Sequence, residues 1–171
     1  MLWVTRAAVH LDRVASPWLI ARFLDPGATF GFVQAGEPVP ASARGFGLPG
    51  SEFPPHDADG STFRKLMRSG GLVDRALLEL ADMVETGIAI TVGQPRAKPH
   101  PFGAALAALA EGLSALHVVD QDVLDRAFPL YDALYASSWA ARRDDLPTAP
   151  AQRFAALREV DWASVLRPPR E

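Results

Sequence analysis

The sequence predicts an α+β fold: a small sheet with a strand-helix-strand start, followed by a mainly helical second half. Two observations predict this fold class. Residues 2–34 read as a strand, a short helix and a second strand. From residue 61 onward, after a stretch rich in glycine and proline, apolar residues recur at helical spacing.

The two predicted strands lie at residues 2–6 and 28–34, with one helix between them. A strand-helix-strand segment usually forms a right-handed crossover, so we expect the strands to be parallel neighbours. In that arrangement the loop at residues 6–13 lies at the C-terminal edge of the sheet, beside the start of the helix. Ligands bind at this edge in open α/β sheets.

The helix between the strands is expected to begin at Ser16 and to end before Pro26. The Ser16 side chain can accept hydrogen bonds from the free N–H groups of the first turn. Pro17 suits the first helical position, where no N–H is needed. The helix should end at Asp25, because the residue before a proline is disfavoured in the α region.

Charged residues lie on or beside this short helix, and burying a charge without a partner is costly. One interpretation is a network of aspartate and arginine that stabilises the helix. The other is an oxyanion site, in which arginine and the N–H groups of the helix start bind the anion. The predicted anion-binding residues are Arg13, Ser16, Arg22 and His10, with Asp12, Trp18, Tyr131 and Tyr135 in support.

The helical half is expected to begin with two capped helices. Ser61 or Thr62 can cap the first, and Asp74 can cap the second. We expect residues 86–99 to form a loop that contains a brief strand at 88–92.

Two longer helices are expected at 101–113 and 120–143. Pro129 lies inside the second and should kink it or split it, because proline removes a hydrogen bond and clashes with the preceding turn. Aromatic residues follow at spacings of three to four. They can pack in the core, or a phenol from Tyr131 or Tyr135 can point into a site.

The last segment contains several prolines and could form a short amphipathic helix and a turn capped by Asp161. We therefore predict one domain over residues 1–145. A proline-rich extension over residues 146–171 is expected to pack on the domain or on a partner.

The composition indicates an ordinary globular protein, with 171 residues, 49% hydrophobic residues and a net charge of −3. There is no overall basic field that would favour nucleic acid. No apolar run is long enough to cross a bilayer and no signal peptide is evident, so we expect a cytoplasmic protein with no membrane partner. The absence of cysteine excludes disulfides, thiolate metal sites and cysteine nucleophiles.

A second candidate site lies in the loop before the helical half, at Glu52, His56 and Asp57. An imidazole and carboxylates so close together could bind a divalent metal ion. A loop held by aspartate turns is the other interpretation. If this loop folds back onto the sheet edge, His10, Arg13 and His56 could converge. The sequence has no phosphate-binding glycine loop, H-E-x-x-H or nucleophile elbow.

A resemblance to a known family is carried by four blocks, WVTR, LDRVASPWLIARFLDPGATFGFV, GSEFPPHDADGSTF and YDALYASSWA. They resemble the C-terminal domain of the chromate resistance protein B family, also called the chromate resistance exported protein domain. The similarity spans residues 1–140 and is weak over 85–118. It implies a role in sensing or detoxifying chromate, and it implies shared residues at Glu52, His56 and the Thr62-Phe63 pair.

The sequence departs from the pattern of this family at several positions. Family members tend to carry cysteine where this chain has Ser16 and Ser61, so thiol chemistry is not implied here. An acidic residue is expected at the position of Arg64, and the acidic motif near residue 86 is not evident. Longer members have an N-terminal region linked with DNA binding that this sequence lacks, so no direct nucleic-acid binding is expected.

Three hypotheses follow, and the residues do not decide whether the protein is an enzyme. The first is a domain that binds a small inorganic oxyanion such as chromate, because arginine forks and helix N–H groups suit a tetrahedral dianion. The second is a metal-dependent enzyme, hydrolytic or redox-protective, with a divalent metal ion at Glu52, His56 and Asp57. The third is an interaction module in which the aromatic helix and the tail form a homodimer.

Overall fold

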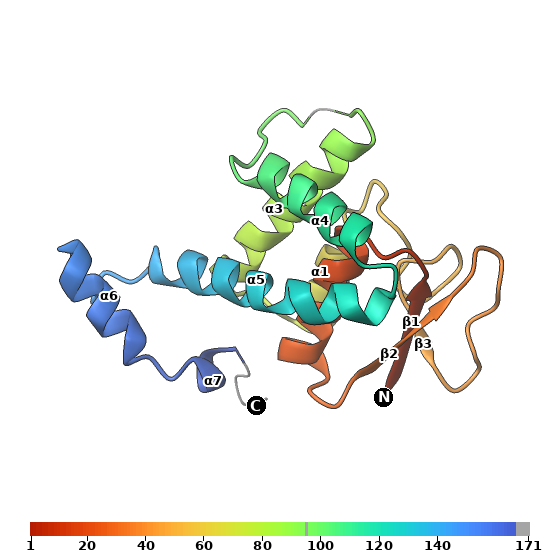
Figure 1. The fold of residues 1–171 in the computed structure, drawn as a ribbon, viewed down its shortest axis with the longest axis horizontal. Coiled ribbons are helices and arrows are strands. Elements are labelled where there is room, and N and C mark those ends of the chain that lie inside the picture. Colours follow the sequence, from red (N-terminus) through yellow and green to blue (C-terminus); the bar gives the residue numbers. More distant parts are fainter. Residues whose placement is uncertain (95, 167–171) are drawn as a thin grey trace.

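The structure, a computed structural model, describes residues 1–94 and 96–166. It has an α+β fold, as the sequence predicts. Figure 1 shows a small sheet at one end of the molecule, with helices beside it and extending away from it. In the described part of the chain, no helix combines the length and the apolar character needed to span a membrane.

The sheet has three parallel strands in the order β2-β1-β3. Strand β1 (Leu2–Arg6) lies in the centre and pairs with β2 (Thr29–Val33), so the predicted parallel pair is confirmed. Strand β3 (Arg44–Gly45) pairs with the other side of β1. It was not predicted, because two residues in a glycine-rich loop carry no periodicity of their own.

Helix α1 (Asp12–Leu19) begins earlier than the predicted start at Ser16, which was therefore wrong. Its buried face already includes Val14 and Ala15, and the preceding residue, Leu11, is also buried. Together with Trp18 these residues have the spacing of one helical face, and burial of this face outweighs the local preference of the Ser-Pro pair for a helix start. Ser16 and Pro17 therefore lie inside the helix.

The helix continues as a π-helical segment, η1 (Ile20–Leu24), and ends before Pro26 as predicted. Asp25 caps this end and leaves the helical conformation. Its carboxylate accepts the N–H of Gly27 at 3.2 Å and the indole N–H of Trp3 at 3.0 Å. The end of the helix is thereby bonded to strand β1.

Helices α2 (Thr62–Ser69) and α3 (Arg75–Thr91) have the predicted caps, Ser61 and Asp74. The predicted loop from residue 86, with its brief strand, was wrong because α3 continues to Thr91. Gly87 lies in this last part and packs closely on Leu11, so the end of α3 is fixed by packing rather than by local helix preference.

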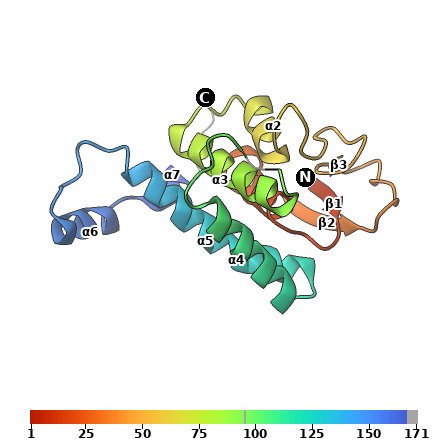
Figure 2. The same cartoon turned by 90° about the horizontal axis from the view of Figure 1, so that it is seen from above.

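Helices α4 (Gly103–Leu116) and α5 (Asp120–Ala140) follow α3 in the chain. Helix α5 is continuous through Pro129, so the predicted split does not occur. Buried residues lie before and after the proline, and this packing compensates for the lost hydrogen bond. Helix α4 contacts both α3 and α5, as Figure 2 shows from above.

The core is formed where α1 meets the other helices. Trp18 is fully buried and its ring is stacked on Phe63 at 6.4 Å between centroids. Tyr131 and Tyr135 of α5 pack on the same indole at 5.8 and 6.0 Å. The aromatic stripe of α5 is therefore core packing.

The C-terminal segment contains α6 (Pro150–Arg158) and α7 (Trp162–Val165), and neither helix has a buried residue. Figure 1 shows α6 at the end of the molecule opposite to the sheet. Trp162 packs on Trp139 of α5, with ring centroids 5.4 Å apart. Residues 167–171 of the predicted extension lie outside the described residues.

Candidate functional site

A cavity of about 310 Å³ lies at the C-terminal end of β1, the edge at which the sequence predicted a ligand site. We call it the β1-edge cavity. Its walls come from the end of β1, the start of α1, the loops before α2 and the end of α3. The lining residues are Arg6, His10, Leu11, Asp12, Arg13, Gly47, Pro55, His56, Thr62, Ile88, Thr91 and Val92.

Four of these side chains are cationic or can become so. The structure places His10, Arg13 and His56 in the lining of this one cavity, because the loop that contains His56 returns to the sheet edge. Arg6 joins them and was missed by the sequence analysis. Its position could have identified it, because Arg6 is the last residue of a strand that ends at the predicted ligand edge.

Arg13 has an incompletely satisfied guanidinium group. Its Nη2 donates to the Ala8 carbonyl at 3.0 Å, and its Nε is buried without a hydrogen-bond partner in the described part of the chain. Burial lowers the pKa of Arg13, and the charge of Arg6 lowers it further, while Asp12 and Asp120 oppose this shift. Arginine nevertheless stays protonated in proteins, so two neighbouring positive charges remain at the cavity.

His10 lines the same cavity and is half-buried. Burial lowers its pKa below the ordinary value of 6.5, and the charge of Arg13 acts in the same direction. The carboxylate of Glu111 partly opposes the shift. The imidazole is therefore neutral at neutral pH, and it gains a charge only under more acidic conditions.

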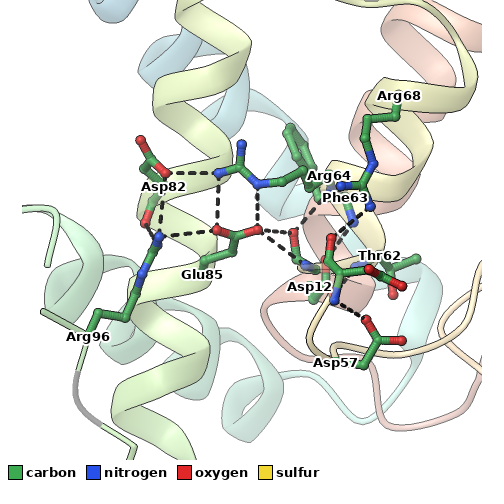
Figure 3. A network of polar contacts seen from close by, with 11 residues as sticks. Asp12, Asp57, Thr62, Phe63, Arg64, Arg68, Asp82, Glu85 and Arg96 are labelled. Atoms are coloured by element: carbon green, nitrogen blue, oxygen red, sulfur yellow. Dashed lines mark hydrogen bonds and ion pairs between the residues drawn. The ribbon is translucent and has the colours of Figure 1, made fainter. Parts of the chain in front are cut away.

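Asp12 is bonded to the start of α2, as Figure 3 shows. Its two carboxylate oxygens accept the backbone N–H groups of Thr62 at 2.8 Å and Phe63 at 3.0 Å. Burial raises the pKa of Asp12, and these two hydrogen bonds partly offset the rise. Asp12 thus satisfies two free N–H groups of α2 and fastens α2 to α1.

Ser16 does not take part in an anion site of the predicted kind. Its side chain is fully buried, and its hydroxyl donates to Asp12 Oδ1 at 3.3 Å. The predicted N–H groups at a helix start beside Ser16 do not exist, because α1 begins at Asp12.

Arg22 is also placed away from the β1-edge cavity. Its Nε and Nη2 each donate at 2.8 Å to the carboxylate of Asp132 on α5. The indole N–H of Trp18 donates to the same carboxylate at 2.7 Å. Arg22 therefore belongs to a structural network of aspartate and arginine, which was one of the two interpretations of the sequence. Its partner is Asp132 rather than Asp12.

The supporting aromatic residues lie in the core rather than in the cavity lining. The Tyr131 hydroxyl is buried without a hydrogen-bond partner among the described residues, and burial raises its pKa. The Tyr135 hydroxyl donates to Asp74 at 3.3 Å. Neither phenol lines the β1-edge cavity.

The three predicted metal ligands are separated by their pairings. Glu52 forms a two-point ion pair with Arg44, and Asp57 forms an ion pair with Lys65 at 2.7 Å. His56 instead lines the cavity. Within residues 1–94 and 96–166, histidine and acidic residues form no group of three or more that could hold a metal ion.

A network that the sequence analysis missed joins α2 to α3 (Figure 3). Arg64 donates to both carboxylate oxygens of Glu85, at 2.6 and 3.0 Å, and to Asp82 at 2.8 Å. Arg96 lies 3.3 Å from Glu85, and the Ser61 N–H donates to Glu85 at 3.2 Å. Arg64, the position at which an acidic residue was expected, is therefore the partner of a nearly buried glutamate.

Comparison with known proteins identifies the family of this chain. The family model described as "ChrB, C-terminal domain" matches residues 3–138. Protein ChrB of Cupriavidus metallidurans is 35% identical over 142 residues, which cover 82% of this chain and 42% of that relative. The chain thus spans less than half of the length of that relative. No solved structure matches.

Proposed function

The chain belongs to the ChrB C-terminal domain family, and from this premise we propose that it binds a small oxyanion such as chromate in the β1-edge cavity. The binding serves a sensing or detoxification role in chromate resistance. The premise supplies the class of ligand, and the geometry of the cavity supplies the residues that would hold it.

One observation carries this proposal. Arg6 and Arg13 line the same cavity, and in the part of the chain that the structure describes neither forms an ion pair. Arg22, Arg44 and Arg64, by contrast, are each paired with a carboxylate. The arginines at the cavity therefore have hydrogen-bond donors to offer, and a bound anion would give Arg13 a charged acceptor.

The dimensions suit a hydrated ion. The volume of about 310 Å³ is many times the roughly 10–15 Å³ of accessible space that one buried water molecule needs. A tetrahedral oxyanion and part of its hydration shell fit into this space. Arginine forks bind two oxygens of such an anion at once, and the imidazoles of His10 and His56 can donate to the others.

The carboxylate of Asp12 also lines the cavity. Both of its oxygens are directed to the N–H groups at the start of α2. Because hydrogen bonds and the helix dipole compensate this negative charge, its repulsion of an anion is reduced.

Calorimetric titration with chromate tests the proposal, with sulfate as a competitor. We expect the wild-type protein to bind, and Arg13→Ala to bind about 10- to 100-fold more weakly, since a charge-assisted hydrogen-bonded pair contributes roughly 1.5–3 kcal/mol. Arg75→Ala is the matched control, because Arg75 is exposed and is not one of the residues that line the cavity. No heat with either anion, or equal binding by Arg13→Ala, would overturn the proposal.

A further inference from the structure

The loop between β1 and α1, residues 7–11, has an unusual backbone. Ala8 has φ 58° and Leu11 has φ 44°, so both occupy the left-handed region that favours glycine. Residues other than glycine stay in such conformations only where the surroundings hold them, and they cluster at functional sites. His10 lies between these two residues, and Arg13 follows in the first turn of α1.

Side chains from other elements hold the main chain of this loop. The carboxylate of Asp120 accepts the N–H groups of Ala8 at 3.1 Å and Val9 at 2.7 Å. The Ala8 carbonyl accepts from Arg13, and the Val9 carbonyl accepts from the hydroxyl of Ser114 at 2.8 Å. The backbone N–H and C=O groups of two consecutive residues, Ala8 and Val9, are thus all hydrogen-bonded to side chains.

Asp120 suits this task through its chemistry and its position. It is the first residue of α5, and a carboxylate offers two acceptor oxygens, one for each N–H group. An asparagine side chain has a single acceptor oxygen and could satisfy one of the two groups fully. Asp120 does not line the β1-edge cavity.

We propose that Asp120 is a positioning residue of the oxyanion site: it holds the β1–α1 loop in the strained shape that keeps His10 and Arg13 in the cavity wall. This inference rests on the proposed function. It predicts that anion affinity depends on a residue that touches no anion. By linkage, a bound anion should in turn stabilise the loop that Asp120 holds.

A purely local role of Asp120 is the competing explanation. An acidic residue in the first turn stabilises a helix through its dipole, and Asp122 also lies in the first turn of α5. Asp122 is exposed and does not bond the loop, so Asp122→Asn removes the same charge from the same helix turn. It is therefore the matched control for Asp120→Asn.

The experiment combines two measurements on the full chain. Chromate affinity is measured by titration at fixed ionic strength, and hydrogen exchange is followed at the amides of Ala8 and Val9. We expect Asp120→Asn to bind chromate about tenfold more weakly and to exchange faster at both amides. Bound chromate should slow this exchange in the wild type, and Asp122→Asn should behave as the wild type does.

Ser114→Ala is the milder second variant, should Asp120→Asn fold poorly. It removes one hydrogen bond to Val9 and leaves Asp120 in place, so a few-fold loss of affinity with faster loop exchange is expected. Unchanged affinity of a folded Asp120→Asn protein, or an equal loss in Asp122→Asn, would overturn this inference alone. Absence of chromate binding by the wild type would overturn the proposed function and this inference with it.

Discussion

Arg22 and Asp132 form a two-point ion pair, in which Nε and Nη2 of the arginine each donate to a carboxylate oxygen at 2.8 Å. Arg13, in the same helical segment of the sequence, has no such partner among the residues that the structure describes, and it lines the β1-edge cavity. One arginine therefore holds α1 and η1 to α5, and the other is available to a ligand. This division of roles between the two arginines can be tested with one substitution at Arg22 and one at Arg13.

Arg22→Ala should destabilise the protein without weakening chromate binding. The variant leaves the Asp132 carboxylate with the indole of Trp18 as its remaining donor. Breaking a buried pair costs about 3–5 kcal/mol, but these side chains are 18% and 25% exposed, so we expect about 1–3 kcal/mol. Urea unfolding measures this loss, with Arg75→Ala as the exposed control. A large loss of chromate affinity at unchanged stability would assign Arg22 to the site instead.

Asp12→Ala should lower stability by about 2 kcal/mol, because it leaves two N–H groups at the start of α2 without an acceptor. Asp59→Ala is the control, since Asp59 is exposed in the loop before α2. Thermal or urea unfolding of both variants makes the comparison. Equal stabilities would show that the Asp12 carboxylate does not fasten α2 to α1.

Anion affinity should rise as the pH falls through the range in which His10 titrates. Folding lowers the pKa of His10 below 6.5, so the free protein holds the neutral imidazole. A bound anion favours the charged form, hence binding takes up a proton and strengthens by up to about tenfold per pH unit. Sulfate is the appropriate probe, because chromate itself takes up a proton near neutral pH. Calorimetry at constant ionic strength measures the profile.

The lowered pKa of His10 also determines how the free energy of unfolding changes with pH when no anion is bound. As pH falls below 6.5, the unfolded chain takes up the His10 proton first, so the free energy of unfolding decreases until the lower folded pKa is passed. Burial and the charge of Arg13 oppose protonation of His10, and the charge of Glu111 favours it. His10→Gln should flatten both profiles. A sulfate affinity that is independent of pH in the wild type would contradict this account.

Arg64→Ala should destabilise the protein at neutral pH and lose this effect in acid. Burial acts to raise the pKa of Glu85, but the hydrogen bonds and charges of Arg64 outweigh it and keep the pKa below 4.5. This contribution is present above the unfolded pKa and disappears as pH falls through the lower folded pKa.

We therefore expect a difference of about 1–3 kcal/mol between wild type and Arg64→Ala at neutral pH, reduced for the partial exposure of Arg64. The difference should begin to shrink below about pH 4.5 and should disappear once the pH has fallen through the lower folded pKa of Glu85. Urea unfolding at several pH values measures it. Arg68→Ala, on the same helix, is the control, because within residues 1–94 and 96–166 Arg68 contacts a backbone carbonyl and no carboxylate. A difference that persists in acid would assign the stabilisation to packing rather than charge.

Much of the fold could be predicted because its signals are local. The two caps Ser61 and Asp74 act on N–H groups within the following turn, and both are present. The parallel pair β1–β2 follows from the short crossover between its strands. Strand β3 could not be predicted, since it exists through its pairing with Trp3 and Val4 rather than through its own residues.

The start of α1 shows where local signals mislead. Ser16 followed by Pro17 is a common helix start, yet the chain is already helical at Asp12. The stabilising contacts of this first turn come from α2, whose N–H groups bind Asp12 across about 50 residues of sequence. No pattern within residues 12–17 contains that information.

The candidate site was predictable only in part. A ligand edge beside Arg13 and His10 follows from the strand-helix-strand crossover. His56 was expected to join them if its loop folds back onto the sheet edge, and His56 does line the cavity. The partner of Arg22 lies 110 residues away in the sequence. Asp120, which holds the β1–α1 loop, is equally remote from it. Charges on one short helix can therefore be identified from sequence, but their division between fold and ligand requires the tertiary structure.

The most direct test of the central claim is a crystal structure of the protein with chromate, with the anion located by the anomalous scattering of chromium. We expect a chromium peak in the β1-edge cavity, with chromate oxygens at hydrogen-bond distance from Arg13 and with Arg6 beside them. A peak elsewhere on the molecule, or no peak at a chromate concentration that saturates binding in solution, would contradict the account.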